Sequence, residues 1–329
     1  MRVTVKAHAR LHFGFIDPDG SSGRQFGSIG LSINEPAIIL EATPADRLSA
    51  AGQERDRVLA LARRFLRHYN IRHRAHIAVK TTIPAHAGLG SGTQLALSVA
   101  SALARLFSIN ADVRKLAAVM GRGGRSGIGI AAFERGGFIV DAGRRVSMGR
   151  TVESELKRIE ARTSGLLPPT IVRYPLPREW TFVVAVPHVG HGLTGKKEVR
   201  AFHRLAGRPA DAGRLSRIVL MQMLPSVLER DPIVFGESLT RIQRIVGAWF
   251  QSVQGGTFAT TQGAALVKAM SRAGALGVGQ SSWGPAVYGL AKDQEMAASI
   301  MGRMRTIVPH KINADIFPVR AFNRGADIR

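Results

Sequence analysis

The chain carries, at residues 84–94, the stretch Pro84-Ala85-His86-Ala87-Gly88-Leu89-Gly90-Ser91-Gly92-Thr93-Gln94, and an alanine- and leucine-rich run follows it to Phe107. Three glycines and two hydroxyl side chains fall within six positions. Glycine permits left-handed backbone and close approach of a phosphate oxygen, so successive N–H groups can converge on an anion. A helix beginning here adds the positive end of its dipole. We therefore interpret residues 75–107 as a strand, a phosphate-binding loop and a helix; the alternative is a glycine-rich turn that only starts a helix.

Composition limits the class of protein. The 329 residues are 45% hydrophobic and 21% charged, as in ordinary globular proteins, and the length suffices for two domains with their own cores. The chain has no cysteine, which excludes disulfides, thiolate metal ligands and a thiolate nucleophile. The N-terminus lacks an apolar signal region, and no run of 18 apolar residues occurs, so we expect a cytoplasmic protein with no membrane partner.

The formal net charge of +23 admits three explanations. Nucleic-acid binding is one, because clustered cations release counterions from a polyanion. The cations are dispersed along the chain, however, and Arg outnumbers Lys by 37 to 9, a bias that arginine-rich codon usage produces. Anionic small substrates are the third, since guanidinium matches phosphate geometry. We favour codon bias with a phosphorylated small substrate and expect no nucleic-acid partner.

Hydrophobic periodicity predicts a chain of mixed strands and helices. In the first half we expect strands at 3–9, 27–31, 37–42, 75–83 and 138–141, and helices at 56–69 and 113–120. Between the last helix and the last strand, residues 121–137 are too rich in glycine for a packed element, and two arginines, Arg122 and Arg125, lie among the glycines at 121–129. A flexible connector is the alternative for this cluster, but it leads directly into a buried strand that ends in Asp141.

A polar, proline-bearing stretch at 145–178 predicts a domain boundary, with one domain at 1–165 and a second at 175–329. In the second we expect a strand at 181–186, helices at 197–206, 214–229, 232–253, 262–273 and 292–303, and strands at 275–290 (with a small-residue loop), 306–309 and 315–322. Helices packed on mostly antiparallel strands give an α+β fold. His188 and His191 follow the first of these strands without a third metal ligand nearby, so polar loop histidines, or one phosphate or carboxylate contact, are favoured over a metal site.

Three glycine-bearing segments, near 10–14, 84–94 and 277–285, stand in an order that resembles the GHMP superfamily of small-molecule kinases. The phosphate-loop motif of that superfamily matches Pro84-x-x-x-Gly88-Leu89-Gly90-Ser91. The resemblance covers essentially the whole chain. It implies an N-terminal domain like ribosomal protein S5, with the loop at 84–94, and a C-terminal ferredoxin-like α/β sandwich, with the loop at 277–285.

One position departs from the kinase pattern. In the sugar and mevalonate kinases the segment that matches Ser126-Gly127-Ile128-Gly129 usually ends in an Asp that serves as the catalytic base; here the residue is Gly129. Glycine has no group that accepts a proton, so phosphorylation of a hydroxyl by that route is disfavoured. The homoserine kinase branch also lacks this base, so an ATP-dependent kinase stays an alternative.

A finer pattern resembles the β-ribofuranosylaminobenzene 5'-phosphate synthase family. It consists of Ala9-Arg10-Leu11-His12-Phe13-Gly14, His86, Gly92-Thr93-Gln94, Arg125-Ser126-Gly127-Ile128-Gly129 and Gly279-Gln280-Ser281-Ser282-Trp283-Gly284-Pro285. The resemblance implies condensation of phosphoribosyl pyrophosphate with 4-aminobenzoate, which releases CO2 and pyrophosphate and forms a carbon-linked riboside of methanopterin biosynthesis. No ATP is expected, and superfamily relatives are often dimers, so a homodimer is expected.

The resemblance also implies roles for individual residues. The expected catalytic residues are Arg10, His12, Arg125 and Ser126. The expected pyrophosphate-binding residues are His86, Gly88, Leu89, Gly90, Ser91, Gly92, Thr93 and Gln94, with Mg²⁺ accompanying the pyrophosphate and Ser91 as its candidate protein ligand. The expected substrate-binding residues are Arg24, Asp141, His188, Lys196, Gln280, Ser281, Ser282 and Trp283; core packing is the alternative for Trp283 and a solvated surface charge for each cation taken alone.

Overall fold

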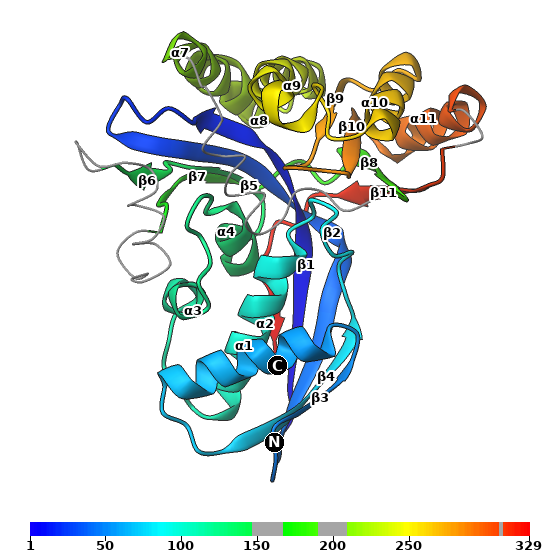
Figure 1. Ribbon diagram of the computed structural model, residues 1–329. Coiled ribbons are helices and arrows are strands. Elements are labelled where there is room, and N and C mark those ends of the chain that lie inside the picture. Colours follow the sequence, from blue (N-terminus) through cyan, green and yellow to red (C-terminus); the bar gives the residue numbers. More distant parts are fainter. Residues whose placement is uncertain (147–166, 190–208, 309–311) are drawn as a thin grey trace.

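The computed structural model describes residues 1–146, 167–189, 209–308 and 312–329, and these form two sheets with their helices (Figure 1). The first sheet contains eight described strands: β1 (Val3–Asp17), β2 (Arg24–Ala45), β3 (Ser49–Gly52), β4 (Arg74–Thr81), β5 (Phe138–Asp141), β6 (Arg144–Arg145), β7 (Thr170–Tyr174) and β12 (Asp327–Ile328). Its helices are α1 (Arg55–His68), α2 (Ser91–Leu106), α3 (Val113–Val119) and α4 (Ile128–Glu134). The strand, loop and helix predicted around residue 88 are thereby confirmed.

The second sheet has the strand order β11-β8-β10-β9, and all its pairs are antiparallel. Its strands are β8 (Thr181–Pro187), β9 (Gly277–Gln280), β10 (Val287–Ala291) and β11 (Ala314–Arg320). The helices of this half are α7 (Pro209–Ile218), α8 (Leu224–Leu228), α9 (Pro232–Gln254), α10 (Thr261–Arg272) and α11 (Gln294–Ile307), with a π-helical turn at Val219–Met223 between α7 and α8. The predicted α+β class is confirmed.

Strand β1 carries two of the predicted catalytic residues and runs from one sheet toward the other. Its odd-numbered residues from Val3 to Phe15 are all buried apolar side chains, so the period-2 pattern continues beyond the predicted end at Ala9. Arg10 and His12 are even-numbered and therefore lie on the opposite face, next to each other. Register shifts in the pairing with β2 flank His12, which bends the strand at this point.

Helix α2 is buried on nearly all sides. Every residue from Gln94 to Ala104 is buried, and the helix packs on β1 and β2 and against α1, α3 and α4. A helix that is apolar all round belongs in a core rather than on a surface. The start of α2, and with it the end of the glycine loop, is therefore held at a fixed place.

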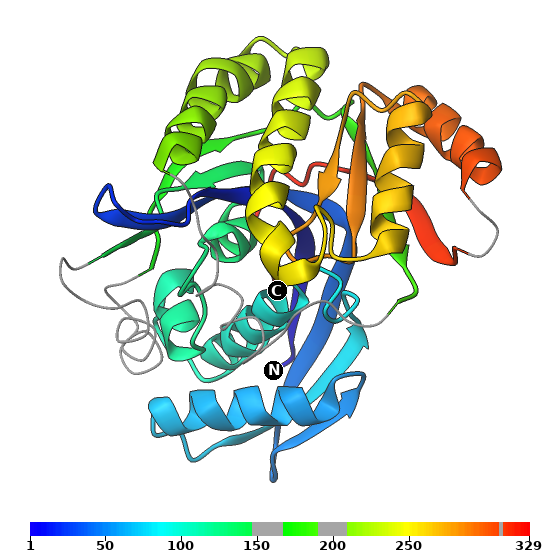
Figure 2. The same cartoon turned by 45° about the horizontal axis from the view of Figure 1, so that its top comes forward.

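An aromatic cluster joins the two halves. The ring of Phe13 on β1 lies 6.1 Å from Phe182 on β8 and 5.2 Å from Tyr288 on β10, measured between ring centroids. Alternate residues of β8 face opposite ways: Phe182 belongs to this shared core, whereas Val183 packs with α10 and α11. Figure 2 shows α9 lying across the junction between the two sheets. The two halves thus share one hydrophobic core.

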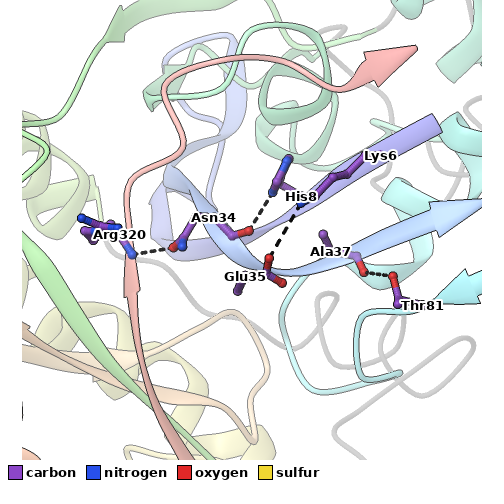
Figure 3. A network of polar contacts seen from close by, with 7 residues as sticks. All are labelled: Lys6, His8, Asn34, Glu35, Ala37, Thr81 and Arg320. Carbon is purple, nitrogen blue, oxygen red and sulfur yellow. Dashed lines mark hydrogen bonds and ion pairs between the residues drawn. The ribbon is translucent and has the colours of Figure 1, made fainter. Parts of the chain in front are cut away.

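The end of the chain returns to the first sheet. Beyond β11, a β-bridge joins Ile33 to Ala321, and β12 pairs with β1. Figure 3 shows the polar contacts at this crossing: the Arg320 backbone N–H donates to the Asn34 side-chain oxygen (2.6 Å), and the His8 ring donates to the Asn34 carbonyl (2.8 Å). The division at 165–175 stays a prediction, and residues 321–329 pack on the first half.

Two predictions of secondary structure were wrong. The glycine-rich segment 121–137, expected to contain no packed element, includes the buried helix α4. Residues 306–309 were expected to form a strand, but α11 continues to Ile307. Ala297, Ile300 and Met304 follow helical spacing and pack in the core under this helix, which extends the helix past the expected end at 303. None of the helices within the described ranges has the length and apolarity that a bilayer crossing requires.

Candidate active site

A serine from the second half joins the glycine loop to β1. The Ser281 hydroxyl donates to the Gly88 carbonyl at 2.7 Å and accepts the backbone N–H of His12 at 3.0 Å. Gly88 has φ +81°, and a Cβ there would lie 2.2 Å from the Ser281 carbonyl oxygen, so this position requires glycine. The loops at 84–94 and 277–285 and the strand segment at 10–14, which the sequence grouped only by resemblance, therefore meet at one place.

Arg10 supports the loop from the β1 side. Its guanidinium donates to the Gly88 carbonyl, and its backbone N–H donates to the Leu89 carbonyl at 3.1 Å. Its Cγ lies 3.0 Å from the position that a Cβ on Gly90 would take. Arg10 thus holds the loop in shape and places a cation directly beside it.

His12 and Ser126 come together across the site. The Nε2 atom of His12 lies 3.2 Å from the Ser126 hydroxyl, and this hydroxyl also accepts the Ile128 N–H at 3.2 Å. His12 is only 3% exposed. Burial, reinforced by the charge of Arg10, lowers the pKa of His12 to about 3. The imidazole is therefore neutral at physiological pH and serves as a hydrogen-bonding group, not as a cation.

Asp141 positions the segment that contains Arg125 and Ser126. One of its carboxylate oxygens accepts the Gly127 N–H and the other the Gly143 N–H, both at 2.8 Å. Arg24 closes the same arrangement by donating to the carbonyls of Ala142 (2.7 Å) and Gly143 (2.8 Å). Asp141 is fully buried, and the backbone amides of Gly127 and Gly143 and the neighbouring Ser28 surround its carboxylate.

The buried carboxyl of Asp141 predicts a pH dependence of stability. Burial raises its pKa to about 6, although the amides of Gly143 and Gly127 act in the opposite direction. Between about pH 4 and pH 6 the folded state then holds more protons than the unfolded state, so this carboxyl lowers the free energy of unfolding as pH rises. We expect Asp141→Asn to remove about 3 kcal/mol of that pH-dependent change, since each pKa unit corresponds to about 1.4 kcal/mol.

Urea unfolding at pH 4, 5, 6 and 7 measures this effect, and Asp56→Asn on the exposed surface of α1 is the matched control. The slope of the free energy of unfolding against pH reports the titration of the carboxyl. The cost of replacing one hydrogen-bond acceptor by an amide is the same at every pH and does not change this slope. An unchanged slope in Asp141→Asn would contradict the assignment.

Gly129, where the kinases carry their base, packs against the start of α2. A Cβ at this position would lie 3.1 Å from Cγ2 and 3.2 Å from Cβ of Thr93. The Gly129 carbonyl accepts the side-chain amide of Gln94 at 2.8 Å, and Gln94 is buried. Thr93 therefore crowds the space that a side chain on residue 129 needs, and Gln94 holds the backbone at this position.

The remaining loop residues differ in their exposure to solvent, and their phosphate-binding role stays a prediction. Gly90, Ser91, Gly92 and Thr93 are half-buried, and His86 is exposed with φ +58°. Leu89 is fully buried and anchors the loop in the core. The start of α2 is thus reachable from solvent while the helix behind it is not.

Two arginines that the sequence did not single out as site residues approach this helix start. A Cβ on Gly92 would lie 2.7 Å from Nη2 of Arg57 and 3.5 Å from Nη1 of Arg122. Arg57 belongs to α1, far away in sequence, and was counted only as part of an amphipathic helix. The sequence signal was the density of arginines at 122–125, but nothing local indicated which way their side chains point.

Residues 280–283 serve mainly to hold the second loop. Gln280 accepts the Ala259 N–H (2.7 Å) and donates to the Ser282 carbonyl (3.0 Å), while the Ser282 N–H donates to the His12 carbonyl (3.1 Å). Trp283 is 5% exposed and meets Phe250 edge-on, with ring centroids 4.4 Å apart. This is the core-packing alternative for Trp283; substrate roles for these residues stay predictions.

The two other predicted substrate contacts lie apart from this cluster. His188 follows β8, and its exposed ring lies 3.0 Å from the Asp315 carboxylate on β11. None of the contacts within the described ranges connects it to the glycine loop. Lys196 falls outside the described residues.

A protein-held metal does not fit the residues at the loop. Within the described part of the chain, no three His, Asp or Glu side chains come together as a metal site, and the Asp141 oxygens are used by backbone amides. Mg²⁺ prefers several oxygen ligands, usually carboxylates together with substrate phosphates. The Ser91 hydroxyl alone does not supply such a set, so its assignment as a metal ligand stays a prediction.

Two cavities adjoin the His12 side of the site. A pocket of about 20 Å³, room for roughly one water, is lined by His12, Phe15 and Trp283 among others. A larger cavity of about 640 Å³ lies between α9 and α10 and shares with it Gln243, Gln254 and Thr257. A third cavity, of about 440 Å³, is lined by Arg24 and Asp141.

Comparison with known proteins fits this arrangement. The GHMP kinases N terminal domain matches residues 56–137, and the GHMP kinases C terminal domain matches residues 223–310. A beta-ribofuranosylphenol 5'-phosphate synthase of Methanothermobacter thermautotrophicus is 36% identical over 97% of this chain and 99% of its own length. The chain belongs to this synthase family. A second member, from Archaeoglobus fulgidus, is 32% identical over 99% of both chains.

Solved structures of other enzymes share the fold of this chain at lower sequence identity. A homoserine kinase from Cytophaga hutchinsonii (TM-score 0.65, 19% identity) covers all of this chain and 97% of its own. A mevalonate pyrophosphate decarboxylase from Streptococcus pyogenes (TM-score 0.68, 12% identity) covers 98% of this chain and 97% of its own. The predicted GHMP fold and the predicted family are thus confirmed, and the relatives are enzymes that make a ribofuranosyl phosphate product.

Proposed function

We propose that this protein transfers the 5-phosphoribosyl group of phosphoribosyl pyrophosphate to a para-substituted benzoate, with release of pyrophosphate and CO2. The arrangement around Gly129 supports this best. Thr93 packs where a kinase needs a carboxylate base, Gln94 bonds to the backbone carbonyl of the same residue, and the Asp141 carboxylate accepts two backbone amides. The site offers anion-binding groups in place of a base.

The reaction balances without a base. The bond between ribose C1 and the pyrophosphate oxygen breaks, and its electron pair leaves with pyrophosphate. The ring carbon that bears the carboxylate then bonds to ribose C1, because a lone pair on the para substituent makes this carbon nucleophilic. Loss of CO2 returns its bonding electrons to the ring and restores aromaticity. Since no proton leaves carbon, a strong general base is unnecessary.

The main task of the protein is to stabilise developing negative charge on pyrophosphate. Backbone N–H groups of the glycine loop, the hydroxyls of Ser91 and Thr93 and the start of α2 supply preorganised donors. Each such donor contributes about 3 kcal/mol of transition-state stabilisation in comparable sites. Mg²⁺ enters this proposal as part of the pyrophosphate substrate, which matches the lack of a carboxylate set among the described loop residues.

The acceptor is 4-aminobenzoate or 4-hydroxybenzoate. The motifs indicated the amine, whereas the names of the similar proteins contain a phenol. Both acceptors place a lone pair para to the attacked carbon. The pocket of about 20 Å³ beside His12 is far too small for either ring, so acceptor binding requires this pocket to widen toward the 640 Å³ cavity.

Incubation with phosphoribosyl pyrophosphate, Mg²⁺ and each acceptor in turn tests the proposal. We expect one riboside phosphate, identified by mass spectrometry, and one pyrophosphate per product. A parallel reaction with ATP and small alcohols tests the kinase alternative. ATP turnover without pyrophosphate release from phosphoribosyl pyrophosphate would contradict the proposal. We also propose that the protein is a cytoplasmic homodimer and that its reaction belongs to methanopterin biosynthesis.

A further inference from the structure

We propose that Arg57 and Arg122 form a two-guanidinium clamp that binds the pyrophosphate group of the donor at Gly92. The inference rests on the proposed function and deepens it, because it assigns one end of the donor to one end of the site. Nothing in the motifs or in the resemblance assigns a role to either residue.

The first observation is geometric. Nη2 of Arg57 and Nη1 of Arg122 lie 2.7 and 3.5 Å from the position of a Cβ on Gly92, so both guanidiniums point at the first turn of α2. Arg57 comes from α1 and Arg122 from the segment after α3, and the two meet only in the folded chain. Glycine at position 92 is what lets them approach the helix backbone this closely.

The second observation is an imbalance of charge. Arg64 also approaches: its guanidinium lies 3.0 Å from the Cβ position of Gly121, next to Arg122 in sequence. Against these three cations, the ion pairs of the described residues supply one carboxylate, Glu54, which lies 3.1 Å from Arg57. Nε of Arg122 is buried and has no hydrogen-bond partner among the described residues. Burial, Arg57 and Arg64 together lower the pKa of Arg122 to about 10, so it remains a cation at neutral pH.

A buried guanidinium among like charges is costly unless an anion joins it. Pyrophosphate has the matching chemistry, since guanidinium donates in a planar fork to phosphate oxygens and the helix start adds N–H donors. Arg10 contacts Gly88 and lies beside Gly90, and its β1 neighbour His12 contacts Ser126, so these groups are separate from the two guanidiniums at Gly92. We assign the ribose and the acceptor to this second group of residues. This places the pyrophosphate at Gly92 and the reacting carbon toward His12.

Isothermal titration calorimetry with inorganic pyrophosphate and with ribose 5-phosphate tests the clamp on the full chain. We expect Arg57→Gln and Arg122→Gln to raise the Kd for pyrophosphate by about tenfold to a hundredfold, the effect of losing a hydrogen bond to a charged group. The Kd for ribose 5-phosphate should change by less than about twofold in both. Arg63→Gln, an exposed arginine on α1, is the matched control and should leave both values unchanged.

Thermal unfolding shows whether a variant loses pyrophosphate binding because it is misfolded. Because Arg122 faces like charges, Arg122→Gln should unfold at the same or a higher temperature than the wild type without ligand, yet lose the rise in melting temperature that pyrophosphate induces. Arg122→Lys keeps the positive charge but lacks the planar guanidinium. The rise in melting temperature that pyrophosphate induces in this variant should lie between those of the wild type and of Arg122→Gln.

The outcomes separate the clamp from the proposed function. An unchanged Kd for pyrophosphate in folded Arg57→Gln and Arg122→Gln overturns the clamp, even if the wild type makes riboside phosphate. A loss confined to ribose 5-phosphate overturns the assignment to pyrophosphate. If the variants lose pyrophosphate binding and the wild type itself forms no riboside, the clamp is supported and the proposed function alone is overturned.

Discussion

Replacing Gly129 by Asp is expected to lower kcat/KM of the synthase reaction by about a thousandfold. The new Cβ would meet Thr93 at 3.1 Å, and the carboxylate would extend beyond it beside the anion-binding loop. Like charges about 4 Å apart near a protein surface repel by about 4 kcal/mol, which corresponds to this factor. We also expect no ATP-dependent kinase activity to appear, because the variant restores only the base and not the kinase substrate site.

Two companion variants separate space from charge. Gly129→Asn matches Asp in size but is neutral, so it should lose markedly less activity, whereas Gly129→Ala adds only the Cβ and should lose least. Thr93→Ser removes the nearest atom, Cγ2, and should partly restore Gly129→Asn but not Gly129→Asp. Full activity in a folded Gly129→Asp protein would show that this position does not matter to the reaction.

Removing the His12 side chain is the second large effect that we expect. His12→Ala should lower kcat/KM by about a hundredfold to a thousandfold, the usual range for one preorganised polar group. The reason is that its Nε2 lies 3.2 Å from the Ser126 hydroxyl, opposite the glycine loop, so the ring fixes the segment that carries Arg125. His12→Gln should retain more activity than His12→Ala, since its amide can reach toward Ser126.

The pH profile distinguishes a neutral His12 from a titrating one. Because burial and Arg10 lower the pKa of His12 to about 3, no limb of the kcat/KM profile between pH 5 and 9 should vanish in His12→Gln. The ring also makes the fold acid-sensitive: between about pH 3 and 6.5 the unfolded state binds the additional proton, so stability falls as pH falls. This is opposite in sign to the effect of Asp141. A limb near pH 6 to 7 that disappears in His12→Gln would contradict the neutral assignment.

Ser126→Ala completes the test of this contact. If His12 acts through the Ser126 hydroxyl, the double variant His12→Gln/Ser126→Ala should have about the same kcat/KM as the less active of the two single variants. If the two residues act independently, the fold losses in kcat/KM of the single variants should multiply in the double variant.

Local sequence predicted the elements that local physics determines. The glycines and the apolar run after them predicted the loop and α2, and alternation predicted β1, although the strand continues past Ala9 because Leu11, Phe13 and Phe15 keep the same period. The predicted strand at 306–309 failed because short apolar runs do not distinguish a strand from the last turn of a helix.

Contacts between segments far apart in the chain could not be predicted from the sequence. Ser281 lies 193 positions after Gly88, and only the fold brings its hydroxyl to that carbonyl. Gln280 was predicted as a substrate contact because of its motif, yet its side chain is occupied by Ala259 and Ser282. Arg57 lies in a helix with several other arginines, and the sequence did not distinguish it from the exposed ones such as Arg63. Family resemblance grouped the right loops but did not show which cations turn toward them.

Release of labelled CO2 is the most direct test of the central claim that this site joins a ribose to an aromatic ring without a base. The protein is incubated with Mg²⁺, phosphoribosyl pyrophosphate and carboxyl-labelled 4-aminobenzoate or 4-hydroxybenzoate, and trapped CO2 is counted against pyrophosphate. We predict equal amounts of the two with one of the acceptors, and none when the donor is omitted. No labelled CO2 with either acceptor, from folded protein, would contradict the account.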